Sequence, residues 1–383
     1  MAIFGVRWND LKLEHVEEFL AGAEREPLTW EAKGTELRRE HVTRHVCGFA
    51  NAAEGGYLLL GFELVDERWR ATGCEFPGDD PPVWVSNVVR MTLRPRPRID
   101  VHQWEISEGK RAAVVRVDPV AEPPCVTAGG QLYERVSGET IPVGDPSDVR
   151  ALYDRGRASA ARAEANALRA VEEVAVSALV SSDPFLILAL AVAPVGTAPD
   201  ISAKVFAPRA DARLEERIAA LPGEPLFSEA GWDGVRAITT RVTQDSVVVE
   251  TTPGLVQFWR LRLAWDGSAA GLLRASPGIE RGAWLFADNV FDDGVRSLAS
   301  VVEEAARGIG GYGRAHIVLR PLASQFGLRH GALTRGIPAP ELPPTIQRWA
   351  EGDQWFDDRL LDTMKRELLR ACGFLEWEPE VHD

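Results

Sequence analysis

The sequence predicts a protein of two mixed helix-and-strand domains, of the α+β or α/β class. The first observation is length, because 383 residues exceed the roughly 100–200 of an ordinary domain. The second is an alternation of apolar runs of strand length with segments of helical periodicity. The third is an Ala-, Glu- and Arg-rich stretch over residues 148–180, whose composition favours helix. We therefore expect a first α/β domain over residues 1–150, a helical linker over 151–180 and a second α/β domain over 181–383.

The first domain is expected to mix helices and strands joined by short connections. Its first helix is amphipathic, with Leu13, Val16 and Leu20 on one face. The remaining elements follow from apolar runs, alternation and the positions of Gly and Pro. Helices are expected at 9–24, 36–52 and 84–93, and strands at 28–33, 57–62, 100–106, 111–117 and 131–136.

The second domain shows the same mixture without any motif that indicates a role. Strands are expected at 186–192, 246–250, 257–265 and 316–319, and helices at 210–220, 292–306 and 357–372.

Composition excludes several classes of protein. No apolar run approaches the roughly 20 residues that span a membrane, and no secretory signal begins the chain, so we expect a cytoplasmic protein. The four cysteines are scattered, without the spacing of a zinc ribbon. A net charge of −14 and a pI near 5.1 oppose an extended basic surface, so any nucleic-acid binding must use a local patch.

Acidic residues near two of the predicted strands form a candidate metal site. Glu31 and Lys33 alternate with Ala32, so they share one face of a strand. Glu26 precedes that strand, and Glu63 or Asp66 follows another. Such carboxylates would hold Mg²⁺ or Mn²⁺ and orient water on a phosphodiester, while Lys33 would attract its phosphate. The alternative is a solvated strand face with a surface ion pair.

Arginines form the candidate basic patch. Two groups lie on or beside predicted helices, and Arg is the side chain that binds phosphate in a bidentate manner. The first group is Arg38, Arg39 and Arg44, and the second is Arg90, Arg94, Arg96 and Arg98. A solvated loop is the alternative for the second group.

A glycine-containing helix end is a further candidate contact. Asn51, Gly55 and Gly56 form either a helix cap and turn or a backbone loop that approaches phosphate closely. The sequence leaves both interpretations open.

Four motifs together resemble the Schlafen-type AlbA domain, over about residues 20–150. They are Glu26-x4-Glu31-x-Lys33, the stretch from Phe49 to Phe62 that contains Asn51 and Gly55-Gly56, the segment Thr72-Gly-Cys-Glu75, and Tyr133-Glu-Arg135 with Thr140. The chain departs from the family where Leu64 stands in place of the usual third Asp. The resemblance implies three acidic ligands in nuclease-active members, and it adds Arg135 to the candidate contacts.

Three functions follow from the resemblance and the residues. We rank a nucleic-acid-binding protein first, in bacterial regulation or defence, with RNA or DNA as partner. The second is a metal-dependent endoribonuclease using Glu26, Glu31 and Glu63 or Asp66. The third is an interaction subunit of a multi-protein complex, with a protein partner on the second domain or a homo-oligomer.

Overall fold

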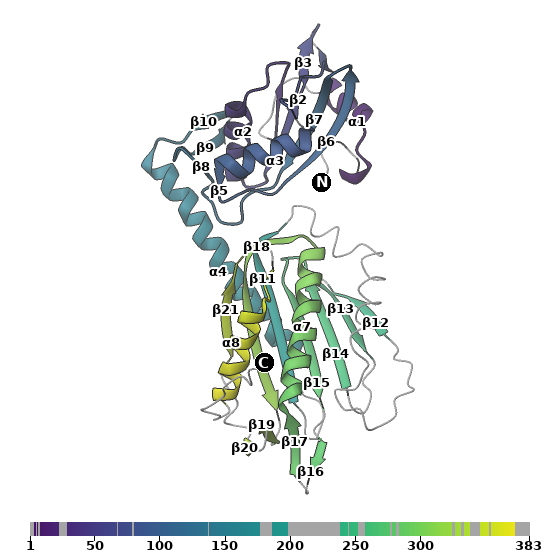
Figure 1. The fold of residues 1–383 in the computed structure, drawn as a ribbon, viewed down its shortest axis with the longest axis vertical. Helices are drawn as coiled ribbons and strands as arrows, with labels where there is room; N and C mark the ends of the chain where they lie inside the picture. Colours follow the sequence, from purple (N-terminus) through teal and green to yellow (C-terminus); the bar gives the residue numbers. More distant parts are fainter. Residues whose placement is uncertain are drawn as a thin grey trace. The chain divides into compact units, whose positions relative to one another are not determined.

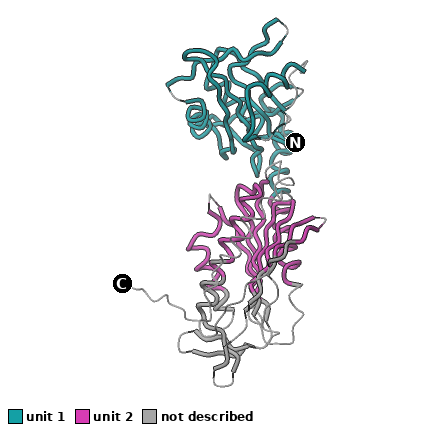
Figure 2. Tube along the Cα trace, turned by 90° about the vertical axis from the view of Figure 1, so that its right-hand side faces the viewer, with its two compact units in different colours: residues 1–159 teal, residues 160–383 magenta. Residues whose placement is uncertain are grey.

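The chain folds into two compact units, residues 1–159 and residues 160–383 (Figures 1 and 2). The computed structural model describes residues 4, 6, 8–22, 29–66, 68–78, 80–136, 138–176, 186–197, 238–243, 245–251, 257–275, 278–280, 283–323, 326–330, 333–337, 345–351 and 354–371. Each unit mixes helices with strands, which confirms the predicted α+β class.

A four-stranded sheet forms the centre of unit 1. Its order is β1 (Trp30–Lys33), β2 (Gly56–Leu60), β7 (Lys110–Val117) and β6 (Ile99–Ser107). β1 runs parallel to β2, as a helical crossover between them requires, whereas β2, β7 and β6 are antiparallel.

Helices cover both faces of this sheet (Figure 1). On one side, α2 (Arg39–Asn51) and α3 (Pro81–Thr92) pack against Leu58 and Leu60. On the other, α1 (Leu13–Ala21) packs with Leu59, because successive strand residues point to opposite faces. The crossover helix α2 therefore lies directly over the face that carries Glu31.

Shorter elements complete unit 1. They are the 3-10 helix η1 (Trp8–Asp10), the strands β3 (Phe62–Val65), β4 (Arg68–Ala71), β5 (Leu93–Arg94), β8 (Val126–Thr127), β9 (Tyr133–Val136) and β10 (Glu139–Pro142), and the start of α4 (Pro146–Val176). The strand predicted at 57–62 is interrupted, because Gly61 has a φ of 78° and turns the chain from β2 into the β3–β4 hairpin.

Unit 2 is built on a seven-stranded antiparallel sheet. Its order is β12 (Ile238–Val242), β13 (Ser246–Thr251), β14 (Gln257–Ala264), β15 (Ala269–Ala275), β11 (Leu186–Thr197), β18 (Gly311–Ala323) and β21 (Ile346–Ala350). Helix α7 (Asp288–Gly308) packs on one face of the sheet and residues 163–175 of α4 pack on the other. The second half of the segment predicted as a linker is therefore part of the core of unit 2.

A smaller sheet and a final helix complete the described part of unit 2. The sheet has the order β16 (Gly278–Glu280), β17 (Ala283–Ala287), β19 (Phe326–His330) and β20 (Leu333–Ile337), and the helix is α8 (Asp358–Ala371). The helix predicted at 210–220 lies outside the described residues. Within the described segments, no helix combines the length and apolar character that crossing a bilayer requires.

Candidate functional site

Glu31 is the centre of a buried polar network in unit 1. Alternation along β1 places Trp30 and Ala32 in the core beside α1, so Glu31 points toward α2 and is only 5% exposed. One carboxylate oxygen, Oε1, pairs with Lys33 Nζ, and the other, Oε2, pairs with Arg135 of β9. His45 Nε2 of α2 lies 3.7 Å from Oε1. Both oxygens of the carboxylate are thus taken by cations of the chain.

Arg135 ties the β9–β10 hairpin to β1 and α2. Its guanidinium donates to the carbonyl oxygen of Trp30 at 2.8 Å and to the hydroxyl of Thr140 at 3.1 Å. It also lies over the ring of Phe49, with its central carbon 4.9 Å from the ring centroid. The side chain of Arg135 is 1% exposed, so it supports the fold from inside and does not belong to the surface that could meet nucleic acid. Its assignment to the nucleic-acid contacts is corrected accordingly.

His45 is held as a neutral imidazole. Its Nδ1 lies 2.9 Å from the hydroxyl of Thr140. Burial lowers the pKa of His45 to about 3, and the nearby Glu31 carboxylate opposes this shift only in part. The pKa of Glu31 is lowered as well: burial by itself would raise it, and His45, Lys33 and Arg135 outweigh that effect.

The low pKa of His45 predicts that unit 1 loses stability in mild acid. A His in the unfolded chain binds a proton below about pH 6.5, whereas His45 in the folded protein remains neutral down to about pH 3. The free energy of unfolding should therefore have its maximum contribution from His45 above about pH 6.5. Below that pH it should fall by up to about 1.4 kcal/mol per pH unit. Glu31 acts in the same direction, but only as the pH falls below its usual range near 4.5.

The window between about pH 6.5 and 4.5 isolates the histidine. Native-state hydrogen exchange on peptides of β2 and β7, measured across that window, reports the stability of unit 1. A His45→Gln variant should flatten the pH dependence relative to the wild-type chain. Equal slopes for the two proteins would show that His45 is not the titrating group.

The divalent cation that the resemblance implies does not fit the described residues. A metal at Glu31 would have to displace both Lys33 and Arg135 from the carboxylate. Glu63 Oε1 accepts hydrogen bonds from the backbone N and the hydroxyl of Thr35, at 2.9 and 3.2 Å, which lowers the pKa of Glu63. Asp66 is exposed at the tip of the β3–β4 hairpin. Glu26 lies outside the described residues, and within them no group of three His, Cys, Asp or Glu could hold a metal.

The helix end at Asn51 is a structural clamp. Asn51 is 1% exposed; its amide donates to the carbonyl oxygens of Cys125 and Tyr133 at 2.9 Å, and its Oδ1 accepts from Cys125 N at 2.6 Å. Gly55 and Gly56 are buried too, because a Cβ would overlap the Val117 carbonyl at the first and the Phe49 ring at the second. The cap-and-turn interpretation accounts for all three residues, and none of them is available to phosphate at the surface.

Two of the candidate arginines are engaged by carboxylates. Arg38 forms an exposed ion pair with Glu36, and Arg98 Nε lies 3.9 Å from Asp118. The other candidates are exposed, and no ion pair joins them to a carboxylate in the described part of the chain. They are Arg39, Arg44, Arg90, Arg94 and Arg96, and we refer to these five as the arginine surface.

The contact between α2 and α3 locates four of the five arginines, and Arg96 follows the end of α3. The hydroxyl of Thr43 donates to that of Thr92 at 3.0 Å, which joins the middle of α2 to the end of α3. Arg39 lies one turn before Thr43, and Arg44 follows it directly. Arg90 and Arg94 flank Thr92, and an Arg94 guanidinium nitrogen donates to the Arg90 carbonyl at 2.7 Å. The contact thus brings two arginine-containing segments, about 50 residues apart in sequence, next to each other.

Sequence reasoning did not find the roles of His45 and Thr140 in the network. The signal for Thr140 was present, since it ends the motif that contains Arg135. No local pattern indicates that the Thr140 hydroxyl would form hydrogen bonds with both Arg135 and His45. The contact with His45 joins a helix to a hairpin 95 residues away in sequence.

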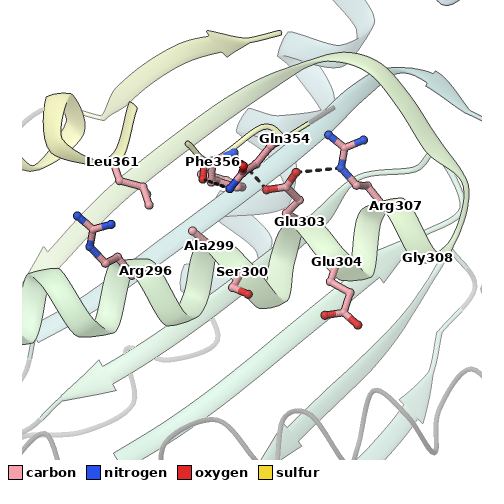
Figure 3. A pocket seen from close by; sticks show the side chains of 10 residues that line it. All are labelled: Arg296, Ala299, Ser300, Glu303, Glu304, Arg307, Gly308, Gln354, Phe356 and Leu361. Atoms are coloured by element: carbon pink, nitrogen blue, oxygen red, sulfur yellow. Dashed lines mark hydrogen bonds and ion pairs between the residues drawn. The ribbon is translucent and has the colours of Figure 1, made fainter. Parts of the chain in front are cut away.

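A groove of about 590 Å³ runs along α7 in unit 2 (Figure 3). Glu303 points toward the segment that holds Gln354 and Phe356, and its carboxylate accepts from the backbone N atoms of Trp355 and Phe356 at 2.7 and 3.1 Å. The two arginines of the groove are neutralised, Arg307 by Glu303 and Arg296 by Asp358 and Asp362. The groove therefore presents less unneutralised positive charge to a phosphate than the arginine surface does.

Comparison with known proteins identifies unit 1. Residues 26–144 match the model of the family described as Schlafen, AlbA_2. The chain carries a Schlafen AlbA-type domain. The match contains the whole Glu31 network and the arginine surface, and it ends before unit 2 begins. An AlbA-type domain indicates a function related to nucleic acid.

The other comparisons add little. One solved structure, the DIP2311 protein from Corynebacterium diphtheriae, is 20% identical with a TM-score of 0.26. That match covers 34% of this chain and 26% of the other, so the chain spans about a quarter of DIP2311, and no argument rests on it. The comparison with curated proteins found no match.

Proposed function

We propose that the AlbA-type domain binds nucleic acid through the arginine surface, without catalysis. The observation that carries the proposal is the contact of α2 with α3, which brings the segment of Arg39 and Arg44 beside that of Arg90 and Arg94, all exposed and none joined to a carboxylate by an ion pair among the described residues. Guanidinium groups bind phosphate oxygens in pairs, and such contacts fix a protein on a nucleic-acid backbone without reading its sequence.

The acidic balance of the chain supports a confined site. At a net charge of −14, phosphate is repelled over long distances, so binding depends on a local excess of positive charge. The arginine surface supplies that excess. The nearby carboxylates Glu36 and Asp118 are paired with Arg38 and Arg98, so they do not neutralise the five arginines of the surface. We expect modest affinity with a strong dependence on salt.

A metal-dependent nuclease receives less support. Phosphodiester hydrolysis by a bound ion needs carboxylates free to coordinate it. Glu31, the buried candidate, is occupied by Lys33 and Arg135. We therefore assign Glu31 to the architecture of the domain, and no catalytic step is derived from it.

The binding proposal predicts a specific loss in a triple variant. Arg39→Ala, Arg44→Ala and Arg94→Ala together should weaken binding of the full chain to a labelled RNA or duplex DNA of about 20 nucleotides by roughly tenfold or more. The slope of log affinity against log salt should also fall by about 2–3, one for each phosphate contact removed. Fluorescence anisotropy at several salt concentrations measures both quantities.

The matched control removes the same charge elsewhere on unit 1. Arg68, Arg70 and Arg157 are exposed, and their replacement by Ala should leave affinity and slope close to wild type, apart from a small general effect of charge. Equal losses in the two triple variants would contradict a defined site. Comparison of the RNA with the duplex DNA shows which of the two the surface prefers.

A further inference from the structure

The edge strand β6 (Ile99–Ser107) is open along its outer side. It forms one end of the β1-β2-β7-β6 sheet, and no strand in the described part of the chain pairs with its other side. With nine residues it is the longest strand of unit 1. An edge of this length presents a row of unpaired backbone donors and acceptors, which is a template for another strand.

The side chains of β6 include few of the features that keep a second strand from pairing with an edge. Charges pointing from an edge usually keep other strands away. Here Asp100 is neutralised by Arg116 of the neighbouring strand β7, the edge contains neither Lys nor Pro, and Glu105, near the end of the strand, is its exposed charge. A bulge between Glu105 and Ser107 interrupts the end of the strand, so the regular part available for pairing is Ile99–Glu105.

The residues that border β6 have complementary charges. Arg98 comes directly before the strand and its side chain is 45% exposed. Glu108 comes directly after it, at an exposed turn. When two copies of one strand pair in antiparallel fashion, the start of each lies beside the end of the other. Arg98 of one copy, whose Nε lies 3.9 Å from Asp118 of its own chain, then lies near Glu108 of the second copy, and the half-exposed guanidinium can contact both carboxylates.

The same alignment also pairs aromatic rings. An alignment centred on Gln103, within the regular part of the strand, places Gln103 opposite Gln103, and therefore His102 opposite Trp104 of the second copy. His102 and Trp104 already share a face of β6, with their rings 16° from parallel and their centroids 6.1 Å apart. The His102 ring also packs edge-on against Trp8 of its own chain, with centroids 4.5 Å apart, so pairing would add Trp104 of the second copy to this cluster, and cross-strand aromatic pairs stabilise sheets.

We propose that the protein forms a two-fold symmetric dimer by antiparallel pairing of β6 with β6 of a second copy. The dimer continues the sheet of unit 1 through both subunits. This interface uses Arg98, which the arginine surface does not include, so it is independent of nucleic-acid binding.

Charge reversal at Glu108 tests the end contacts. Sedimentation velocity of the full wild-type chain from roughly 1 to 100 µM should show a monomer–dimer equilibrium. Glu108→Arg places two arginines together at each end and should weaken the dimer roughly tenfold or more. Glu139→Arg makes the same change at another exposed hairpin position and should leave the dimer intact. A wild-type chain that stays monomeric throughout, or equal effects of the two variants, would overturn the proposal.

A cysteine at position 103 tests the register. Directly opposed residues have Cα atoms about 4.5–5.5 Å apart, within the range that a disulfide bridges. Gln103→Cys should give a covalent dimer under mild oxidation by copper–phenanthroline, while the wild-type chain, with its native cysteines, should not. Failure of the variant to crosslink while it still dimerises would exclude the alignment centred on Gln103 and with it the proposed interface.

Discussion

Arg135→Ala is expected to destabilise unit 1 by about 3–5 kcal/mol, because it leaves the buried Glu31 carboxylate with an unpaired oxygen. The variant also removes donors to the Trp30 carbonyl and the Thr140 hydroxyl, and the cationic contact over Phe49. A loss of this size approaches the total stability of many small domains. Hydrogen exchange on β2 and β7 peptides of the full chain should show it directly.

Two further variants decide the interpretation. Arg157 forms an exposed ion pair with Asp154, so Arg157→Ala should cost at most about 0.5 kcal/mol. The double variant Glu31→Leu with Arg135→Met replaces the buried pair by apolar groups and should recover part of the loss. If Arg135 contacted phosphate instead, Arg135→Ala would weaken nucleic-acid binding and leave exchange unchanged, which would refute the structural role.

The sequence predicts the local geometry of this network but not its partners. Alternation along the strand is enough to place Glu31 and Lys33 on one face, and the structure confirms that they form an ion pair. The burial of that pair depends on Arg135, which is 104 residues away and reaches Glu31 only when the hairpin packs against α2. No local periodicity carries that information, so the sequence left both a surface ion pair and a metal site open.

The same limit applies to the fold: local sequence patterns predict secondary structure, but they do not predict which elements contact each other. Periodicity predicts elements in both units, such as the strand at 246–250 and the helix at 292–306, and the mixed class is confirmed, whereas several strands of unit 2, among them Ala269–Ala275 and Ile346–Ala350, were not predicted. The antiparallel order of the seven strands in unit 2 does not follow, since it depends on which strands pair and not on their own residues. The arginine surface lies between these cases: both groups of arginines are visible in the sequence, whereas the contact of Thr43 with Thr92 that unites them is not.

Gly55→Ala is expected to cost more than about 3 kcal/mol, because two penalties act at one position. The φ of Gly55 is 72°, in the left-handed region that costs other residues about 1–2 kcal/mol. A Cβ there would also overlap the carbonyl oxygen of Val117, which is backbone of the central strand β7 and cannot move aside cheaply. Hydrogen exchange on unit 1 should therefore speed up in every protected peptide of the sheet.

Gly130→Ala is the matched control, since Gly130 has a φ of 78° and nothing within 4 Å of a Cβ. It should cost only the left-handed penalty of about 1–2 kcal/mol, and the difference between the two variants measures the overlap with β7. The comparison also decides between the two interpretations of the loop that follows Asn51. A glycine needed for close approach to phosphate would give a stable Gly55→Ala protein with lost affinity. A glycine needed for packing, as the overlap with the Val117 carbonyl indicates, gives an unstable protein whose folded fraction still binds.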